Sequence, residues 1–277
     1  ENLYPAKIRH NVGRWNRTSV AGYAVATTTP GEGGLLSEKE TIELWEHVAE
    51  AAVPEKLLLA STGAPGVRET VNRANAAADL GYHAVLVETP HLSDGPAAMK
   101  NVQTLFYRGV ADQTKIPVVI GNTPQSSSLA VSVETACLLG EHPNIIAINE
   151  GAGPVDKMAR LIQDVPSGFQ VLAGSVAILY PSLKQGAAGA ILAFANAAPF
   201  LCLSLEEAVR TREYEAAREL HERASTAAGV AVPYGIAGLK YAMDLQGYYG
   251  GPPRLPLMAV SSEAKRQLED AFHGVQS

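Results

Sequence analysis

The chain has 277 residues, 47% of them hydrophobic and 18% charged, a composition that can fill a sizeable core and excludes intrinsic disorder. The net charge of −6 argues against a nucleic-acid-binding surface. No apolar run reaches the roughly 18 residues that a membrane helix needs. The two cysteines, Cys137 and Cys202, exclude a disulfide framework and a cysteine-based zinc site. With no signal peptide visible, we expect a cytoplasmic protein without nucleic-acid or membrane partners.

Short apolar runs alternate with longer helical stretches along most of the chain. Each run is apolar on both faces, which is typical of a buried parallel strand. The predicted strands cover 22–26, 56–60, 84–87, 116–120, 144–148, 169–173 and 189–193. The predicted helices cover 5–15, 41–50, 67–80, 99–111, 132–139, 155–162 and 176–185. This alternation predicts a parallel sheet joined by right-handed crossovers.

The pattern changes after Asn196, where only helices are predicted, at 204–224, 236–245 and 262–273. We therefore expect one α/β domain over 1–200 and a C-terminal helical extension over 201–277 that packs on it. A doubly wound sheet stays open at this point. No G-x-G-x-x-G follows the first strand, however, so the usual dinucleotide signature is missing, and we expect no cofactor.

Several segments resemble the dihydrodipicolinate synthase/N-acetylneuraminate lyase family, in particular its 4-hydroxy-2-oxoglutarate aldolase-like members. They read LSEKE at 36–40, HPNIIAI at 142–148, FQVLAGS at 169–175, GAAGAILAFAN at 186–196, GIAGLK at 235–240 and GYYGGP at 247–252. The resemblance implies a TIM (β/α)8 barrel with a C-terminal three-helix extension, a small-molecule substrate and a homo-oligomer, either a dimer or a tetramer. The first barrel strand is not evident in this chain, which leaves open a shortened N-terminus.

The resemblance also implies a mechanism whose main residues are missing here. A lysine at the end of the family's sixth strand forms a Schiff base with a 2-oxo acid, but that strand reads NIIAINE at 144–150, so its lysine position is Asn149. A carboxamide cannot form an imine. The tyrosine of the family's Y-N-x-P motif, a proton shuttle, is replaced by Gly121. We infer that the family's covalent reaction is lost.

Polar residues at the carboxyl ends of the predicted strands are the remaining candidates, since barrel enzymes place their chemistry there. The catalytic candidates are Asn149, Glu88 and Asn122. Asn149 is either a hydrogen-bond donor to a substrate oxygen or an inert remnant, and Glu88 is either a base or a structural partner of a polar neighbour. The candidates for substrate binding are Thr28, Thr29, Thr62, His91, Gly121 and Ser175. No spacing supports a metal site at Glu88, His91 and Glu150, so we expect no metal.

Three functional hypotheses follow. The first is an enzyme that catalyses a non-covalent lyase, isomerase or cyclisation step on a small oxygenated or 2-oxo-acid-like substrate. The second is a pseudoenzyme or binding subunit without catalytic activity. The third is a conventional 4-hydroxy-2-oxoglutarate-type aldolase that uses another lysine, and the missing lysine at position 149 argues against it.

Overall fold

A curled parallel sheet forms the centre of the computed structural model, which describes residues 2–275 except residue 29, segments 90–98 and 124–129, and residue 152. Within these residues seven strands lie in chain order, each parallel to the next. They are β1 (Gly22–Val25), β2 (Leu57–Ser61), β3 (Ala84–Glu88), β4 (Val118–Asn122), β5 (Ile145–Glu150), β6 (Gln170–Ala173) and β7 (Gly189–Ala190). Each strand lies on one of the predicted apolar runs.

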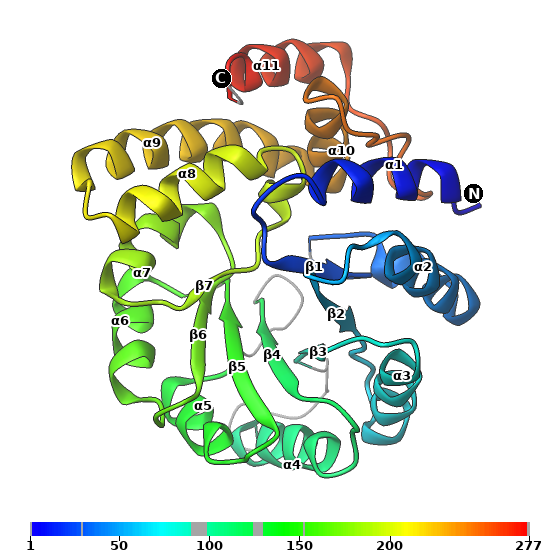
Figure 1. The fold of residues 1–277 in the computed structure, drawn as a ribbon, viewed down its shortest axis with the longest axis vertical. Coiled ribbons are helices and arrows are strands. Elements are labelled where there is room, and N and C mark those ends of the chain that lie inside the picture. Colours follow the sequence, from blue (N-terminus) through cyan, green and yellow to red (C-terminus); the bar gives the residue numbers. More distant parts are fainter. Residues whose placement is uncertain (1, 29, 90–98, 124–129, 152, 276–277) are drawn as a thin grey trace.

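Helices connect the strands and lie around the outside of the sheet (Figure 1). They are α1 (Pro5–Trp15), α2 (Glu38–Ala51), α3 (Val67–Asp79), α4 (Met99–Ala111), α5 (Val133–Gly140), α6 (Val155–Asp164) and α7 (Leu179–Gln185). A capping box begins α2: the Ser37 side chain accepts from the Glu40 backbone N–H, and the Glu40 carboxylate accepts from the Ser37 backbone N–H. This arrangement satisfies two amides that a helix start leaves unpaired.

The two faces of the sheet bury different residues because side chains alternate along a strand. On the inner face, Leu86, Val119 and Ala147 form a small apolar cluster. On the outer face, Val87 and Ile120 belong to the large core between sheet and helices. A polar side chain at the carboxyl end of a strand therefore points into the space enclosed by the curled sheet only if it occupies an inner-face position.

The sheet ends at β1 on one side and at β7 on the other, and no pairing joins these two strands within the described residues. The strand that the family resemblance would place before β1 is not among the strands that the structure describes. The curled parallel sheet, the surrounding helices and the C-terminal helices confirm the predicted barrel-type fold.

The C-terminal part contains α8 (Pro199–Arg210), α9 (Tyr214–Ala231), α10 (Gly235–Leu245) and α11 (Ser262–Phe272). The single helix predicted at 204–224 is wrong, because α8 and α9 are separate helices joined by a short turn. Arg212 adopts a left-handed backbone conformation in this turn, with a φ of 65°. No glycine or proline marks the turn, so the sequence pattern continues through it.

The C-terminal helices have an apolar cluster of their own, which includes Leu201, Ala227, Met243 and Leu268. Trp15 of α1 packs against both this cluster and the barrel core. Along the described parts of the chain, no helix is both long enough and apolar enough to cross a membrane.

Candidate functional site

Four residues form a row across neighbouring strands near their carboxyl ends. Glu88 of β3 pairs with Gly121 of β4, Gly121 with Asn149 of β5, and Asn149 with Leu172 of β6. The residues two positions earlier on β3, β4 and β5 belong to the inner apolar cluster. Because side chains alternate along a strand, the row also faces the inside of the curled sheet. We call these four residues the mouth row.

Glu88 is held by Thr28, a residue that follows β1 and lies 60 positions earlier in the chain. The Thr28 backbone N–H donates to Glu88 Oε1 at 3.2 Å, and the Thr28 hydroxyl donates to Glu88 Oε2. The Glu88 residue is only 9% exposed. These two hydrogen bonds replace most of the hydrogen bonds to water that the carboxylate loses when it is buried. The structure thus brings together two of the predicted site residues.

Gly121 leaves room for the Glu88 side chain. A Cβ atom at position 121 would lie 3.1 Å from Glu88 Cγ and 3.3 Å from Glu88 Cα. Both distances are shorter than ordinary van der Waals contact between carbon atoms. Glu88 therefore lies in the space that a larger side chain at position 121 would need.

Asn149 is buried in the mouth row, with 5% of its surface exposed. Its side-chain oxygen Oδ1 has no hydrogen-bond partner among the described residues. Buried polar atoms are nearly always paired, so an unpaired one needs an explanation, such as a ligand or a functional role. A ligand that donates a hydrogen bond at this position would satisfy Asn149.

Asn122 lies next to Gly121 in β4 and is engaged on the other side of the sheet. Its Nδ2 donates to Glu150 Oε2 at 2.6 Å and to the Val131 carbonyl at 3.2 Å, and its Oδ1 accepts from the Val131 N–H at 2.9 Å. Glu150 Oε2 also lies 2.6 Å from Lys157 Nζ. These contacts tie the carboxyl ends of β4 and β5 to the segments that follow them. They give Asn122 a positioning role in this structure.

The other predicted binding residues are less closely grouped. Thr62 follows β2 and is fully buried, and its hydroxyl has no partner within the described chain. Ser175 is half-buried in the turn after β6. Thr29 and His91 lie outside the described residues. The structure brings Thr28, Glu88, Gly121 and Asn149 together, and a role for Thr62 and Ser175 stays a prediction.

Every lysine of the chain lies outside the seven described strands. Lys157 is ion-paired with Glu150, and Lys240 is ion-paired with Glu32 at 2.7 Å. Lys56 precedes β2, and its Nζ donates to the backbone carbonyls of Thr18 and Val20. That position is at the end of the strands opposite to the mouth row.

Tyr107 of α4 supports the end of β3 from the outer side. Its hydroxyl donates to the Val87 carbonyl and lies 3.2 Å from the Thr89 hydroxyl. The ring is completely buried, and burial raises the pKa of the Tyr107 hydroxyl well above its ordinary value. The hydroxyl therefore stays protonated and contacts the residue on either side of Glu88: the carbonyl of Val87 and the side chain of Thr89.

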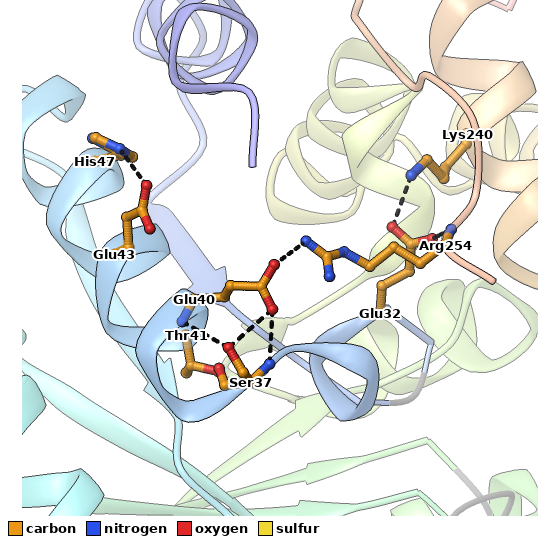
Figure 2. A network of polar contacts seen from close by, with 8 residues as sticks. All are labelled: Glu32, Ser37, Glu40, Thr41, Glu43, His47, Lys240 and Arg254. Carbon is orange, nitrogen blue, oxygen red and sulfur yellow. Dashed lines mark hydrogen bonds and ion pairs between the residues drawn. The ribbon is translucent and has the colours of Figure 1, made fainter. Parts of the chain in front are cut away.

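A polar network fastens the loop after β1 to the C-terminal extension (Figure 2). Glu32 binds Lys240 through Oε2, and its Oε1 accepts from the Arg254 backbone N–H, both at 2.7 Å. The Arg254 guanidinium donates to Glu40 at 2.7 Å. This bond and the backbone N–H of Ser37 lower the pKa of Glu40 to about 2. No sequence pattern predicts this cluster, because Lys240 comes from a segment that is distant from Glu32 and Glu40.

The curled parallel sheet, with polar side chains at the carboxyl ends of its strands, defines a TIM-barrel-type α/β protein. Residues 5–274 match the model of the dihydrodipicolinate synthetase family, and the chain belongs to this family, whose members are lyases.

The relatives agree with this assignment. A 4-hydroxy-tetrahydrodipicolinate synthase from Methanothrix thermoacetophila is 31% identical over 270 residues, which cover 96% of this chain and 88% of that protein. The synthase of the same name from Methanopyrus kandleri is 30% identical, over 94% of this chain and 86% of its own. The crystal structure of a dihydrodipicolinate synthase from Bacillus anthracis shares the fold, with a TM-score of 0.92 at 23% identity, covering 100% of this chain and 94% of that one.

Proposed function

We propose that this chain is an enzyme of the lyase family that acts on a small oxygenated or 2-oxo-acid-like substrate without forming a lysine imine. The observation that carries the proposal is Asn149, a buried inner-face residue of the mouth row with an unpaired side-chain oxygen. It occupies the position where the resemblance would place the reactive lysine. Lys56, Lys157 and Lys240 are each engaged by other groups of the protein, which supports the same proposal.

The mouth row offers two groups that suit a non-covalent proton transfer. Glu88 takes a proton from the carbon next to a substrate carbonyl, the electron pair of that C–H bond forms a C=C bond, and the π electrons of the carbonyl move to its oxygen. The Asn149 amide donates a hydrogen bond to the oxygen as its negative charge develops. When the carbonyl re-forms, return of the proton to the γ carbon of a β,γ-unsaturated substrate completes an isomerisation, and departure of a leaving group from the β carbon with its bonding pair instead completes an elimination.

The first experiment tests the absence of an imine. The purified chain is incubated with pyruvate and sodium borohydride, and its mass is measured. We expect no increase in mass, because reduction traps only an imine. A covalent adduct on any lysine would overturn the proposal and favour a conventional aldolase.

The second experiment tests the proton transfer. Deuterium exchange next to the carbonyl is followed by NMR for a panel of small 2-oxo acids and neutral ketones. We expect Asn149→Ala to slow exchange about a hundredfold, the usual loss when a donor to a developing oxyanion is removed. The matched control is Asn72→Ala on the exposed side of α3, which should leave the rate unchanged. Exchange equal in both variants, or absent from the parent chain, would favour a pseudoenzyme or binding subunit.

A further inference from the structure

Thr28 and Glu88 form a carboxylate-binding arrangement in which the protein supplies the carboxylate. A backbone N–H and a hydroxyl of one residue donate to the two oxygens of one carboxylate. Paired donors of this kind are a common way to bind an anionic oxygen group. Both Thr28 donors are engaged by Glu88, so a ligand carboxylate could use them only by displacing Glu88.

Glu88 also places a negative charge on the face of the sheet that carries Asn149, two strands away. The two residues lie on strands β3 and β5, and Gly121 is the residue between them in the mouth row. Because Gly121 has no side chain, nothing at that position screens a ligand at Asn149 from Glu88. None of the four mouth-row residues is cationic. A carboxylate bound here would meet a like charge in a largely buried environment, where repulsion is strong.

We propose that Glu88 determines specificity by excluding ligands that present a carboxylate to the mouth row. It selects ligands that present a neutral or cationic hydrogen-bond donor, such as a hydroxyl or an ammonium group. Such a donor can pair with the Asn149 oxygen without bringing a like charge near Glu88. This inference rests on the proposed function in one respect: the ligand binds at the mouth row.

The test compares two ligands of nearly the same size, pyruvate and hydroxyacetone. Both are methyl ketones, and the carboxylate of one is replaced by a hydroxymethyl group in the other. Binding to the full chain is measured by ligand-observed NMR titration for the parent, Glu88→Gln and Glu88→Ala. We expect the parent to bind hydroxyacetone at least about tenfold more tightly than pyruvate, which corresponds to about 1.4 kcal/mol.

The two variants distinguish the effect of the Glu88 charge from the effect of the volume that its side chain occupies. Glu88→Gln removes the charge and keeps the shape, so the preference for hydroxyacetone should disappear. Glu88→Ala frees both Thr28 donors, so pyruvate affinity should rise at least about tenfold over the parent. Adding Thr28→Val to Glu88→Ala removes the hydroxyl and should cancel much of that gain. Circular dichroism on each variant confirms that the fold is kept.

Three outcomes would overturn the inference. They are equal binding of pyruvate and hydroxyacetone by the parent, no gain of pyruvate affinity in Glu88→Ala with an intact fold, and no binding of either ligand by any variant. The proposed function fails on other results: a borohydride adduct, or an exchange rate that does not depend on Asn149. The two failures can therefore be told apart.

Discussion

The Glu88 side chain fills the space next to Gly121 on the neighbouring strand, so the size of residue 121 limits where Glu88 can lie. In Gly121→Ala the new Cβ would lie 3.1 Å from Glu88 Cγ, so the Glu88 side chain must shift by a few tenths of an ångström within its contacts to Thr28. We expect a loss of about 1–3 kcal/mol in the free energy of unfolding, the usual cost of overpacking. Urea denaturation measures this loss.

Two controls define the cause. Gly229→Ala, at an exposed position of α9 where an added Cβ meets nothing within 4 Å, should be neutral or stabilising by up to about 1 kcal/mol. In a Glu88→Ala background, Gly121→Ala should cost much less, because the two residues are coupled. An equal loss of unfolding free energy in both backgrounds would show that the added methyl group is not destabilising through contact with the Glu88 side chain.

Strand alternation limits which candidate residues can act together. Gly121 and Asn122 are consecutive in β4, and Asn149 and Glu150 are consecutive in β5. Consecutive strand residues face opposite sides of a sheet, so the sequence could have predicted that Asn122 does not share the mouth row with Gly121. The contact between Thr28 and Glu88 could not be predicted, because it depends on how the sheet curls between β1 and β3.

At the scale of elements, the loop after β1 takes its position from contacts with the C-terminal extension. Glu32 and Glu40 bracket this loop, and their partners Lys240 and Arg254 come from α10 and the segment after it. Local patterns mark the start of α2, because Ser37 and Glu40 form a short-range motif. They could not predict ion pairs across more than two hundred residues. They also missed the turn between α8 and α9, which no glycine or proline marks.

The same network gives stability a defined pH dependence. The pKa of Glu40 is about 2 in the folded chain, against an ordinary value of 4.5. Because the folded-state value is depressed, this carboxylate stabilises the fold fully above pH 4.5, and the contribution is lost as the pH falls towards 2. Arg254→Met should cost about 1 kcal/mol at pH 7, and the deficit relative to the parent should shrink below pH 4.5.

Urea denaturation of parent and variant at pH 7 and pH 3 measures this change. Arg218→Met serves as the control, since Arg218 forms an exposed pair with Glu215 within α9 and such pairs contribute little. A deficit for Arg254→Met that is the same at both pH values would rule out Glu40 as its source.

At the scale of the whole molecule, two apolar cores meet at α1 and along α8 and α9, since Leu205 of α8 belongs to the barrel core and Leu220 of α9 packs against both cores. The barrel core lies between the sheet and its helices, and the extension core lies among α8–α11. Trp15 packs against both. Its ring stacks on Tyr248 with centroids 5.5 Å apart, and its Nε1 donates to the Asn196 carbonyl at 3.2 Å. Trp15 thereby joins the segment between α10 and α11 to α1, and Asn11 of α1 adds two hydrogen bonds to the backbone of Tyr249 in the same segment.

This arrangement predicts that the two cores unfold together. The chain has two tryptophans: Trp15 reports on the junction, and Trp45, fully buried in α2, reports on the barrel. In Trp45→Phe only Trp15 fluoresces, and in Trp15→Phe only Trp45 does. Because Trp15 contributes to both cores, we expect the fluorescence transition of each variant in urea to coincide with its own circular dichroism transition, the signature of two-state unfolding. A Trp15 transition at clearly lower urea than the dichroism change would instead mean that the extension unfolds first, and that the Glu32 and Arg254 contacts do not couple it to the barrel.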